Sequence, residues 1–134
     1  MGQRVCVTGA SGQAGRAVVR ELREHGYDVM ATDAVVTRED LEGGMLRADL
    51  TDYGQAIEAL QGAEARRPAG TGSDHALEAL RGADAVVHLA NIPAPEIATP
   101  AVTFTANVTM NFNVFMAAAR LGVSRVVWAS SETT

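Results

Sequence analysis

The chain has 134 residues, with no lysine, a single cysteine and a single tryptophan. One cysteine cannot form an internal disulfide, and the position of Cys6 in an apolar run predicts a buried, unreactive thiol. The three histidines, at positions 25, 75 and 88, have no ligand spacing and no cysteine partners. We therefore expect no metal site. No apolar run approaches the ~20 residues that span a bilayer, so we also expect no membrane partner.

Positive charge is scarce as well. The net charge is −5 with a pI near 5.1, and all eleven basic residues are arginine. Nucleic acids and acidic membranes bind clustered positive charge, so neither is expected as a partner. The start, Met-Gly-Gln-Arg, has no apolar signal region, which predicts a cytoplasmic protein. The length suits one domain, which we place at residues 1–134.

Strand-like and helix-like apolar patterns alternate along the chain. Strands are predicted near residues 4–8, 28–32, 45–49, 84–89 and 124–129, and helices near 13–25, 52–61 and 104–121. The last helix has the clearest periodicity and is predicted to end at Gly122. Such alternation predicts a doubly wound parallel α/β sheet of strand order 3-2-1-4-5, a Rossmann fold, with a ligand at the carboxyl ends of the strands.

A glycine turn follows the first predicted strand. Residues 5–15 read Val-Cys-Val-Thr-Gly-Ala-Ser-Gly-Gln-Ala-Gly, and a helical pattern begins at Gln13. A strand, a glycine turn and a helix N-terminus together place backbone N–H groups where a pyrophosphate can bind. The alternative is an ordinary strand-to-helix turn that is rich in glycine.

Asp33 ends the second predicted strand, 18 residues after Gly15. A carboxylate there can accept hydrogen bonds from the adenosine ribose and repel a 2′-phosphate, which favours NAD over NADP. Arg38 complicates this preference, because an arginine can accommodate the extra phosphate. The alternative is an aspartate that only starts a turn.

A decapeptide occurs twice between the third and fourth predicted strands. Residues 56–65 read AIEALQGAEA and residues 76–85 read ALEALRGADA, identical at seven of ten positions. Both copies cannot fill one crossover between strands. We predict a duplicated or inserted segment around 56–85, in which one copy forms the crossover helix and the other lies at the surface with an exposed linker.

The glycine spacing, Thr8-Gly-x-x-Gly-x-x-Gly15, resembles that of the extended short-chain dehydrogenase/reductase family of NAD-dependent epimerases and dehydratases. The resemblance implies a dinucleotide held by the turn and by later strand ends. For the turn it implies six residues: Gly9, Ser11, Gly12, Gln13, Ala14 and Gly15. No metal is implied.

Later segments resemble the same family in the expected order. Asp49-Leu50 matches an aspartate–hydrophobic pair against the adenine, although Asp49 could equally cap the next helix. The strand Val86–Asn91 matches a His-Leu-Ala type sequence, which implies Leu89, Ala90 and Asn91 beside the cofactor. His88 itself is predicted to be packed and hydrogen-bonded rather than catalytic. Asn107 matches a helix amide on the cofactor side, with a purely structural role equally open. Its neighbours Asn111 and Asn113 are predicted at the helix surface.

Ser130-Ser131 ends the fifth predicted strand, and the resemblance implies a catalytic Ser131 that positions a substrate oxygen. The family also uses a Tyr-x-x-x-Lys pair after this serine, which the sequence lacks. We therefore expect the NAD-binding portion of an epimerase/dehydratase-type oxidoreductase that acts on a sugar or sugar nucleotide. We expect it to be inactive alone, to lack the C-terminal substrate region and to form homo-oligomers. Alternatives are a non-catalytic, NmrA-like redox sensor and an engineered fragment.

Overall fold

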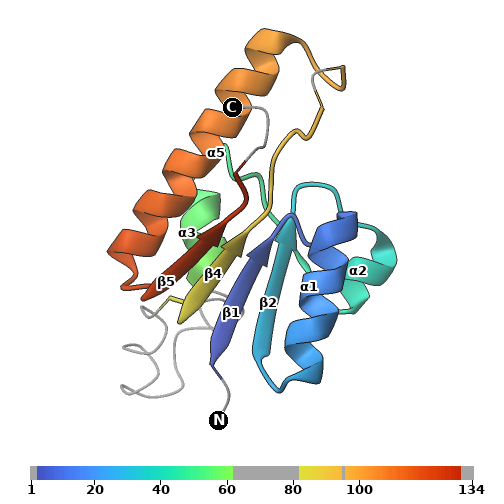
Figure 1. The fold of residues 1–134 in the computed structure, drawn as a ribbon, viewed down its shortest axis with the longest axis vertical. Coiled ribbons are helices and arrows are strands. Elements are labelled where there is room, and N and C mark those ends of the chain that lie inside the picture. The colour runs from blue at the N-terminus through green and yellow to red at the C-terminus, as the bar shows by residue number, and fades with distance from the viewer. Residues whose placement is uncertain (1–2, 62–81, 95, 131–134) are drawn as a thin grey trace.

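The computed structural model describes residues 3–61, 82–94 and 96–130, which form a parallel sheet with helices on both faces (Figure 1). Five strands pair in the order β3-β2-β1-β4-β5. They are β1 (Arg4–Thr8), β2 (Asp28–Asp33), β3 (Leu46–Arg47), β4 (Ala85–His88) and β5 (Arg125–Trp128). The predicted doubly wound α/β fold and its strand order are confirmed.

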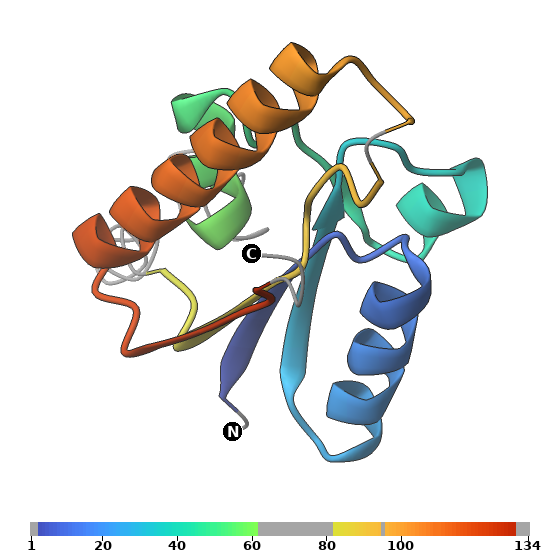
Figure 2. The same cartoon turned by 45° about the horizontal axis from the view of Figure 1, so that its top comes forward.

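The helices divide between the two faces of the sheet, as Figure 2 shows. α1 (Gln13–Glu24) covers one face, and α3 (Tyr53–Gln61) and α5 (Pro100–Arg120) cover the other. α2 (Arg38–Glu42) is a single short helix beside α1. No helix within the described ranges is both long and apolar enough to cross a membrane.

The central strand β1 supplies both cores by alternation of its side chains. Val5 and Val7 are buried with Val19 of α1, while Cys6 is buried with residues of α3 and α5. A strand buried on both faces must be apolar throughout, which is why residues 5–7 form one continuous apolar run. Burial raises the pKa of the Cys6 thiol to about 12, so the predicted inert role is supported.

Element ends differ from prediction mainly where capping decides them. α5 begins at Pro100 rather than near 104, because Thr99 accepts a hydrogen bond from the Val102 N–H and proline suits the first helical turn. α2 was not predicted. Its capping box joins the Thr37 and Asp40 side chains to each other's backbone N–H groups, a signal short enough to miss.

The apolar stripe that indicated α5 lies on its outer side. Val108, Phe112 and Met116 are 50%, 62% and 40% exposed in the described structure, whereas the buried face carries Val114 and Ala117. Periodicity thus identified the helix correctly but did not identify the face that packs on the sheet.

The surface positions predicted for Asn111 and Asn113 are wrong. Asn113 is only 6% exposed, and its Nδ2 donates a hydrogen bond to the Leu50 carbonyl oxygen at 2.9 Å. Asn111 accepts a hydrogen bond from the ring of His88. Both amides lie on the packed side of α5, where hydrogen bonds offset the cost of their burial.

The first copy of the decapeptide supplies the crossover helix, α3. Its Ala56, Ala59 and Leu60 are at most 2% exposed. The chain then continues into β4 through residues of the second copy, and the Ala83 N–H donates to the Leu60 carbonyl oxygen at 2.9 Å. The rest of the predicted insertion, residues 62–81, lies outside the described residues.

Candidate functional site

A cavity of about 720 Å³ opens at the carboxyl ends of β1, β2 and β4. This is the edge at which an open α/β sheet binds its ligand, beside the point where the strand order reverses. Eleven of the thirteen predicted cofactor residues line the cavity: Gly9, Ser11, Gly12, Gln13, Ala14, Gly15, Asp33, Leu50, Leu89, Ala90 and Asn91.

Close approach of backbone segments explains two of the glycines. Gly9 has φ +67°, and a Cβ there would lie 2.8 Å from the Ala90 nitrogen. A Cβ on Gly15 would lie 2.0 Å from the Gly9 carbonyl oxygen. Glycine therefore lets β1, β4 and α1 converge at the floor of the cavity.

The N-terminus of α1 faces this floor. Gly12 is its N-cap and has no side chain that could accept the first N–H groups of the helix. Gln13, Ala14 and Gly15, the first residues of α1, line the cavity. Backbone donors and the positive end of the helix dipole are thus directed at the space where an anionic group would bind.

Asp33 stands at the end of β2 and is joined to the glycine turn. Its Oδ2 accepts hydrogen bonds from the Ser11 N–H at 3.0 Å and the Ser11 hydroxyl at 2.7 Å. Its Oδ1 accepts from the Ala34 N–H at 2.7 Å. The carboxylate therefore lines the cavity and also fixes the shape of the turn.

Arg16 holds the same turn from the other side. Its Nε donates to the Ser11 carbonyl oxygen at 2.9 Å, and its two Nη atoms donate to the Asp40 carboxylate at 2.9 and 3.1 Å. This pairing, together with hydrogen bonds from Thr37, lowers the pKa of Asp40 to about 2. Ser11 is therefore fixed through its amide, hydroxyl and carbonyl groups by residues of α1 and β2.

The segment after β3 contributes Leu50 but not Asp49 to the cavity. Leu50 is 2% exposed and lines the cavity wall. The Asp49 side chain is exposed and accepts hydrogen bonds from the N–H and hydroxyl of Thr51. The alternative role for Asp49 as helix cap is wrong, because Asp52 accepts the Gln55 N–H at the start of α3.

Asn107 braces the loop after β4 instead of lining the cavity. Its Oδ1 accepts the Ile92 N–H at 2.7 Å, and its Nδ2 donates to the Ile92 carbonyl oxygen at 3.2 Å. One amide thus satisfies both backbone groups of a residue that does line the cavity. Any effect of Asn107 on a ligand would pass through this loop.

His88 is packed and hydrogen-bonded, as predicted. It is 1% exposed, and its ring contacts the Thr8 hydroxyl and the Asn111 side chain. Burial lowers its pKa below the ordinary value. The candidate catalytic Ser131 lies outside the described residues.

The sequence did not indicate eight further lining residues. Some of them come directly after a strand, and this position could have been used to predict that they line the cavity. Ala106 and Met110 lie one turn apart on α5, and the sequence did not show which face of that helix meets the cavity. The full set is Ala34, Val35, Ala48, Thr51, Ile92, Pro93, Ala106 and Met110. Among the residues that the structure describes, no cluster of three or more His, Cys, Asp or Glu could hold a metal.

The sequence is similar to proteins of one known family. Residues 5–134 match the model of the NAD dependent epimerase/dehydratase family. An L-arabinose 1-dehydrogenase (NAD(P)(+)) of Haloferax volcanii is 31% identical over 130 residues, covering 96% of this chain and 41% of that protein.

Solved structures agree. A UDP-galactose 4-epimerase has a TM-score of 0.70 at 32% identity, covering 97% of this chain and 39% of its own. The UDP-glucose 4-epimerase of Thermus thermophilus in complex with NAD has a TM-score of 0.71 at 26% identity, covering 96% and 37%. The chain thus spans about two fifths of the length of these three relatives. The resemblance to the extended short-chain dehydrogenase/reductases is confirmed, and the chain belongs to the NAD-dependent epimerase/dehydratase family.

Proposed function

We propose that the chain binds NAD in the cavity at the carboxyl ends of β1, β2 and β4. We further propose that it is the cofactor-binding portion of an oxidoreductase that acts on a sugar or sugar nucleotide. The observation that carries the proposal is the N-terminus of α1, whose first residues line a cavity of about 720 Å³. That volume lies within the roughly 300–1,000 Å³ range of small-molecule sites.

The pyrophosphate would bind at the start of α1. Gly12 leaves the first N–H groups of the helix without a side-chain acceptor, and those donors suit phosphate oxygens. Glycine at positions 9 and 15 keeps side chains out of the approach. The residues present therefore fit the charge and shape of a dinucleotide phosphate.

The adenosine ribose would bind at Asp33, in competition with the Ser11 hydroxyl that now donates to Oδ2. An additional 2′-phosphate would meet the same carboxylate and be repelled, so we propose NAD rather than NADP. Arg38 does not line the cavity, and its Nε donates to Glu42 on the exposed side of α2. Leu50 and Ala48 provide an apolar wall for the adenine.

NAD, when bound, would accept a hydride from a substrate carbon. In this family pattern, Ser131 would position the substrate oxygen while a tyrosine takes the hydroxyl proton. The chain has only two tyrosines, Tyr27 and Tyr53, and no lysine to complete a Tyr-x-x-x-Lys pair with either. We therefore propose that this polypeptide binds the cofactor without turning over substrate.

The proposed substrate class comes from the relatives. The Haloferax protein is named for L-arabinose, and two of the structural relatives are named for UDP-galactose and UDP-glucose. A sugar or sugar nucleotide is the chemistry that these names share, and no membrane or nucleic acid is proposed as a partner.

Calorimetric titration with NAD and NADP tests the cofactor proposal. The intact chain should bind NAD more tightly than NADP, and Asp33→Asn should narrow the ratio of the two dissociation constants by about tenfold, since a charge repulsion of ~1.4 kcal/mol is removed. Asp28→Asn is the matched control, because Asp28 lies at the opposite end of β2. Absence of NAD binding, or equal effects of the two variants on the ratio, would contradict the proposal.

A turnover assay tests the proposal that this polypeptide binds the cofactor without turning over substrate. Reduction of NAD in the presence of L-arabinose should stay at the background rate, and so should the interconversion of UDP-galactose and UDP-glucose followed by chromatography. Measurable turnover by this polypeptide would show that it carries a complete catalytic set.

A further inference from the structure

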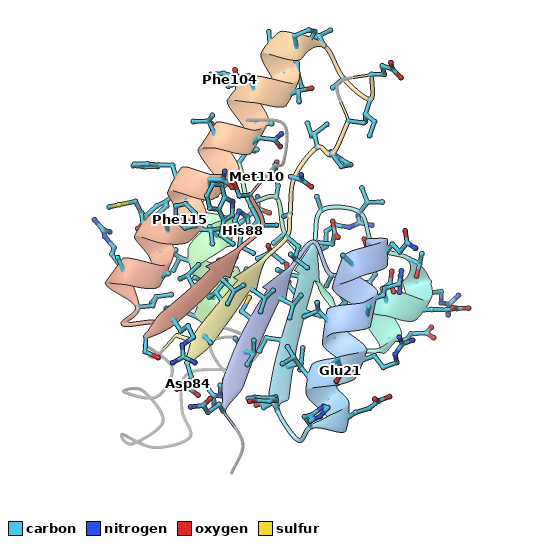
Figure 3. All side chains as sticks on the ribbon, viewed as in Figure 1. Glu21, Asp84, His88, Phe104, Met110 and Phe115 are labelled. Atoms are coloured by element: carbon cyan, nitrogen blue, oxygen red, sulfur yellow. The ribbon has the colours of Figure 1, made fainter. Side chains whose placement is uncertain are left out.

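Three polar side chains form a buried chain of hydrogen bonds beneath the cavity. The Thr8 hydroxyl lies 2.6 Å from Nδ1 of His88, and Nε2 of His88 lies 2.9 Å from Oδ1 of Asn111. Thr8 and His88 are the paired last residues of β1 and β4, and both are at most 1% exposed. Figure 3 shows His88 at the end of β4, beside Phe115 of α5.

The hydrogen-bond donors fix the direction of this chain. The Leu89 and Ala90 N–H groups both donate to the Thr8 hydroxyl oxygen, at 3.1 and 3.2 Å, and so occupy its two lone pairs; the Leu89 N–H is shared with the Thr8 carbonyl oxygen at 3.3 Å. The Thr8 hydroxyl must therefore donate its own proton, and Nδ1 of His88 is the acceptor. Nε2 then carries the ring proton and donates to Asn111. The reverse direction would bring three donors to one hydroxyl oxygen.

The two amides that Thr8 holds form the cavity floor. Leu89 and Ala90 line the cavity directly, and a Cβ on Gly9 would approach the Ala90 nitrogen to 2.8 Å. Since backbone segments meet this closely, a small displacement of residues 89–90 would alter the surface that a ligand contacts. Asn111 anchors the same chain to α5, whose neighbouring Met110 also lines the cavity.

We propose that His88 is a positioning residue for the dinucleotide, and that it performs this role only as the neutral imidazole. A proton on Nδ1 removes the acceptor of the Thr8 hydroxyl, so that hydroxyl can no longer hold both amides of the floor. Ligand affinity then falls when His88 is protonated. The inference rests on the proposed function, because the ligand is the NAD proposed above.

The surroundings of His88 favour its neutral form. Its hydrogen bonds are with Thr8 of β1 and Asn111 of α5, its ring packs edge-on against Phe115 of α5, and Phe115 packs in turn on Trp128 of β5. None of these four described side chains carries a charge that would stabilise an imidazolium. Burial lowers the pKa of His88 below its ordinary 6.5, so the ring is neutral at pH 7 and gains a proton only in acid.

The first experiment measures the dissociation constant of NAD at pH 7.5 for two substitutions of one hydroxyl. Thr8→Val keeps the shape and removes the hydroxyl. We expect about tenfold weaker binding, because the Ala90 N–H loses its acceptor and the Leu89 N–H keeps only the Thr8 carbonyl oxygen. Thr8→Ser keeps the hydroxyl and should bind within about twofold of the unchanged chain. Equal affinities for the two variants would overturn the inference.

The second experiment separates positioning from a merely structural role. The dissociation constant of NAD is measured between pH 5 and 8 for the unchanged chain and for Asn111→Asp. A carboxylate facing Nε2 stabilises the imidazolium, so the pH at which affinity falls should rise by about one unit. A structural role would weaken binding at every pH without moving the profile, and such a result would overturn the inference.

Nitrogen NMR of His88 in the ligand-free chain gives a readout that does not depend on NAD. We expect a proton on Nε2 and none on Nδ1 at pH 7.5. The opposite tautomer would show that the hydrogen bonds from Thr8 through His88 to Asn111 do not run in the direction inferred above. If the unchanged chain fails to bind NAD at any pH, the proposed function itself fails. If NMR shows that His88 gains a proton while the NAD affinity stays the same, only the role of His88 fails.

Discussion

Deletion of residues 63–82 should stabilise the protein. The deletion joins Gly62 to Ala83, so the decapeptide occurs once instead of twice. The sequence at the junction then reads Leu60-Gln61-Gly62-Ala83. Ala83 then stands three residues after Leu60, and the hydrogen bond between its N–H and the Leu60 carbonyl oxygen closes a short turn. Gly62 replaces Gly82, where a Cβ would lie 2.6 Å from the Leu121 Cβ, so the required glycine is retained.

The expected gain comes from chain entropy. In the full chain, the Leu60–Ala83 hydrogen bond holds the ends of a connection that is longer by the 20 residues to be removed. Twenty extra residues in a connection raise its closure cost by about 2–3 kcal/mol by the (3/2)RT ln n relation. The deletion removes most of this cost, and for a domain of this size the midpoint of thermal unfolding should rise by about 10 °C.

A second deletion, of residues 56–75, serves as the matched comparison. It leaves only the second copy, whose Ala76, Ala79 and Leu80 would take the three buried positions of α3. The two one-copy chains differ at only two positions, Ile57 against Leu77 and Gln61 against Arg81, so they should unfold at similar temperatures. The negative control is Leu60→Asp in the first one-copy chain, which buries a charge at a fully buried site and should prevent folding.

Thermal unfolding followed by circular dichroism, with NAD titration of the folded chains, checks the result. NAD affinity should not change, because neither deletion removes a residue that lines the cavity. A lower unfolding midpoint in both one-copy chains would refute the reasoning, since it would show that the extra residues contribute contacts rather than only a loop.

Three further outcomes are expected. Gly15→Ala should abolish NAD binding and lower the unfolding midpoint, because the new Cβ would lie 2.0 Å from the Gly9 carbonyl oxygen; retention of both properties would contradict the close packing of α1. The Arg16 pairing and, after it, hydrogen bonds from Thr37 lower the pKa of Asp40 from 3.8 to about 2; the stability that this contributes above pH 3.8 is lost as the pH falls toward 2, and urea unfolding should show a larger loss in the unchanged chain than in Arg16→Gln. The chain should self-associate without NAD through apolar side chains such as Trp128, 48% exposed, and light scattering that reports only a monomer would contradict this expectation.

The sheet was predictable because most of its strands, and the longer helices that connect them, have their own local patterns. β1 is a continuous apolar run ended by glycine, and α1 has its apolar residues at helical spacing. Parallel connection rules then fixed the order. Helix faces were less predictable. On α5 the apolar residues Val108 and Phe112 lie outward, while Asn113 is buried and donates a hydrogen bond to the Leu50 carbonyl oxygen. Pattern alone cannot report such a partner, because the partner is distant in the sequence.

The cavity was predictable to the extent that strand ends define it. Most turn and strand-end positions line it, but Asp49 and Asn107 do not. Both side chains are used by nearby backbone or hydroxyl groups, of Thr51 for the first and of Ile92 for the second. A short polar side chain near a site can hydrogen-bond to the backbone of its own loop as readily as to a ligand. Only the hydrogen bonds seen in the structure distinguish the two roles.

Asp33 combines both uses. Its carboxylate lines the cavity, yet Oδ2 already accepts two hydrogen bonds from Ser11, and Arg16 holds the carbonyl of the same serine. Removing the side chain with Asp33→Ala would therefore loosen the glycine turn and weaken both nucleotides for a reason unrelated to the ribose. Asp33→Asn keeps an oxygen that can accept from the Ser11 N–H while removing the negative charge. A change in the NAD-to-NADP ratio in Asp33→Asn, compared with a parallel loss of both affinities in Asp33→Ala, thus separates the electrostatic choice of cofactor from the support of the turn.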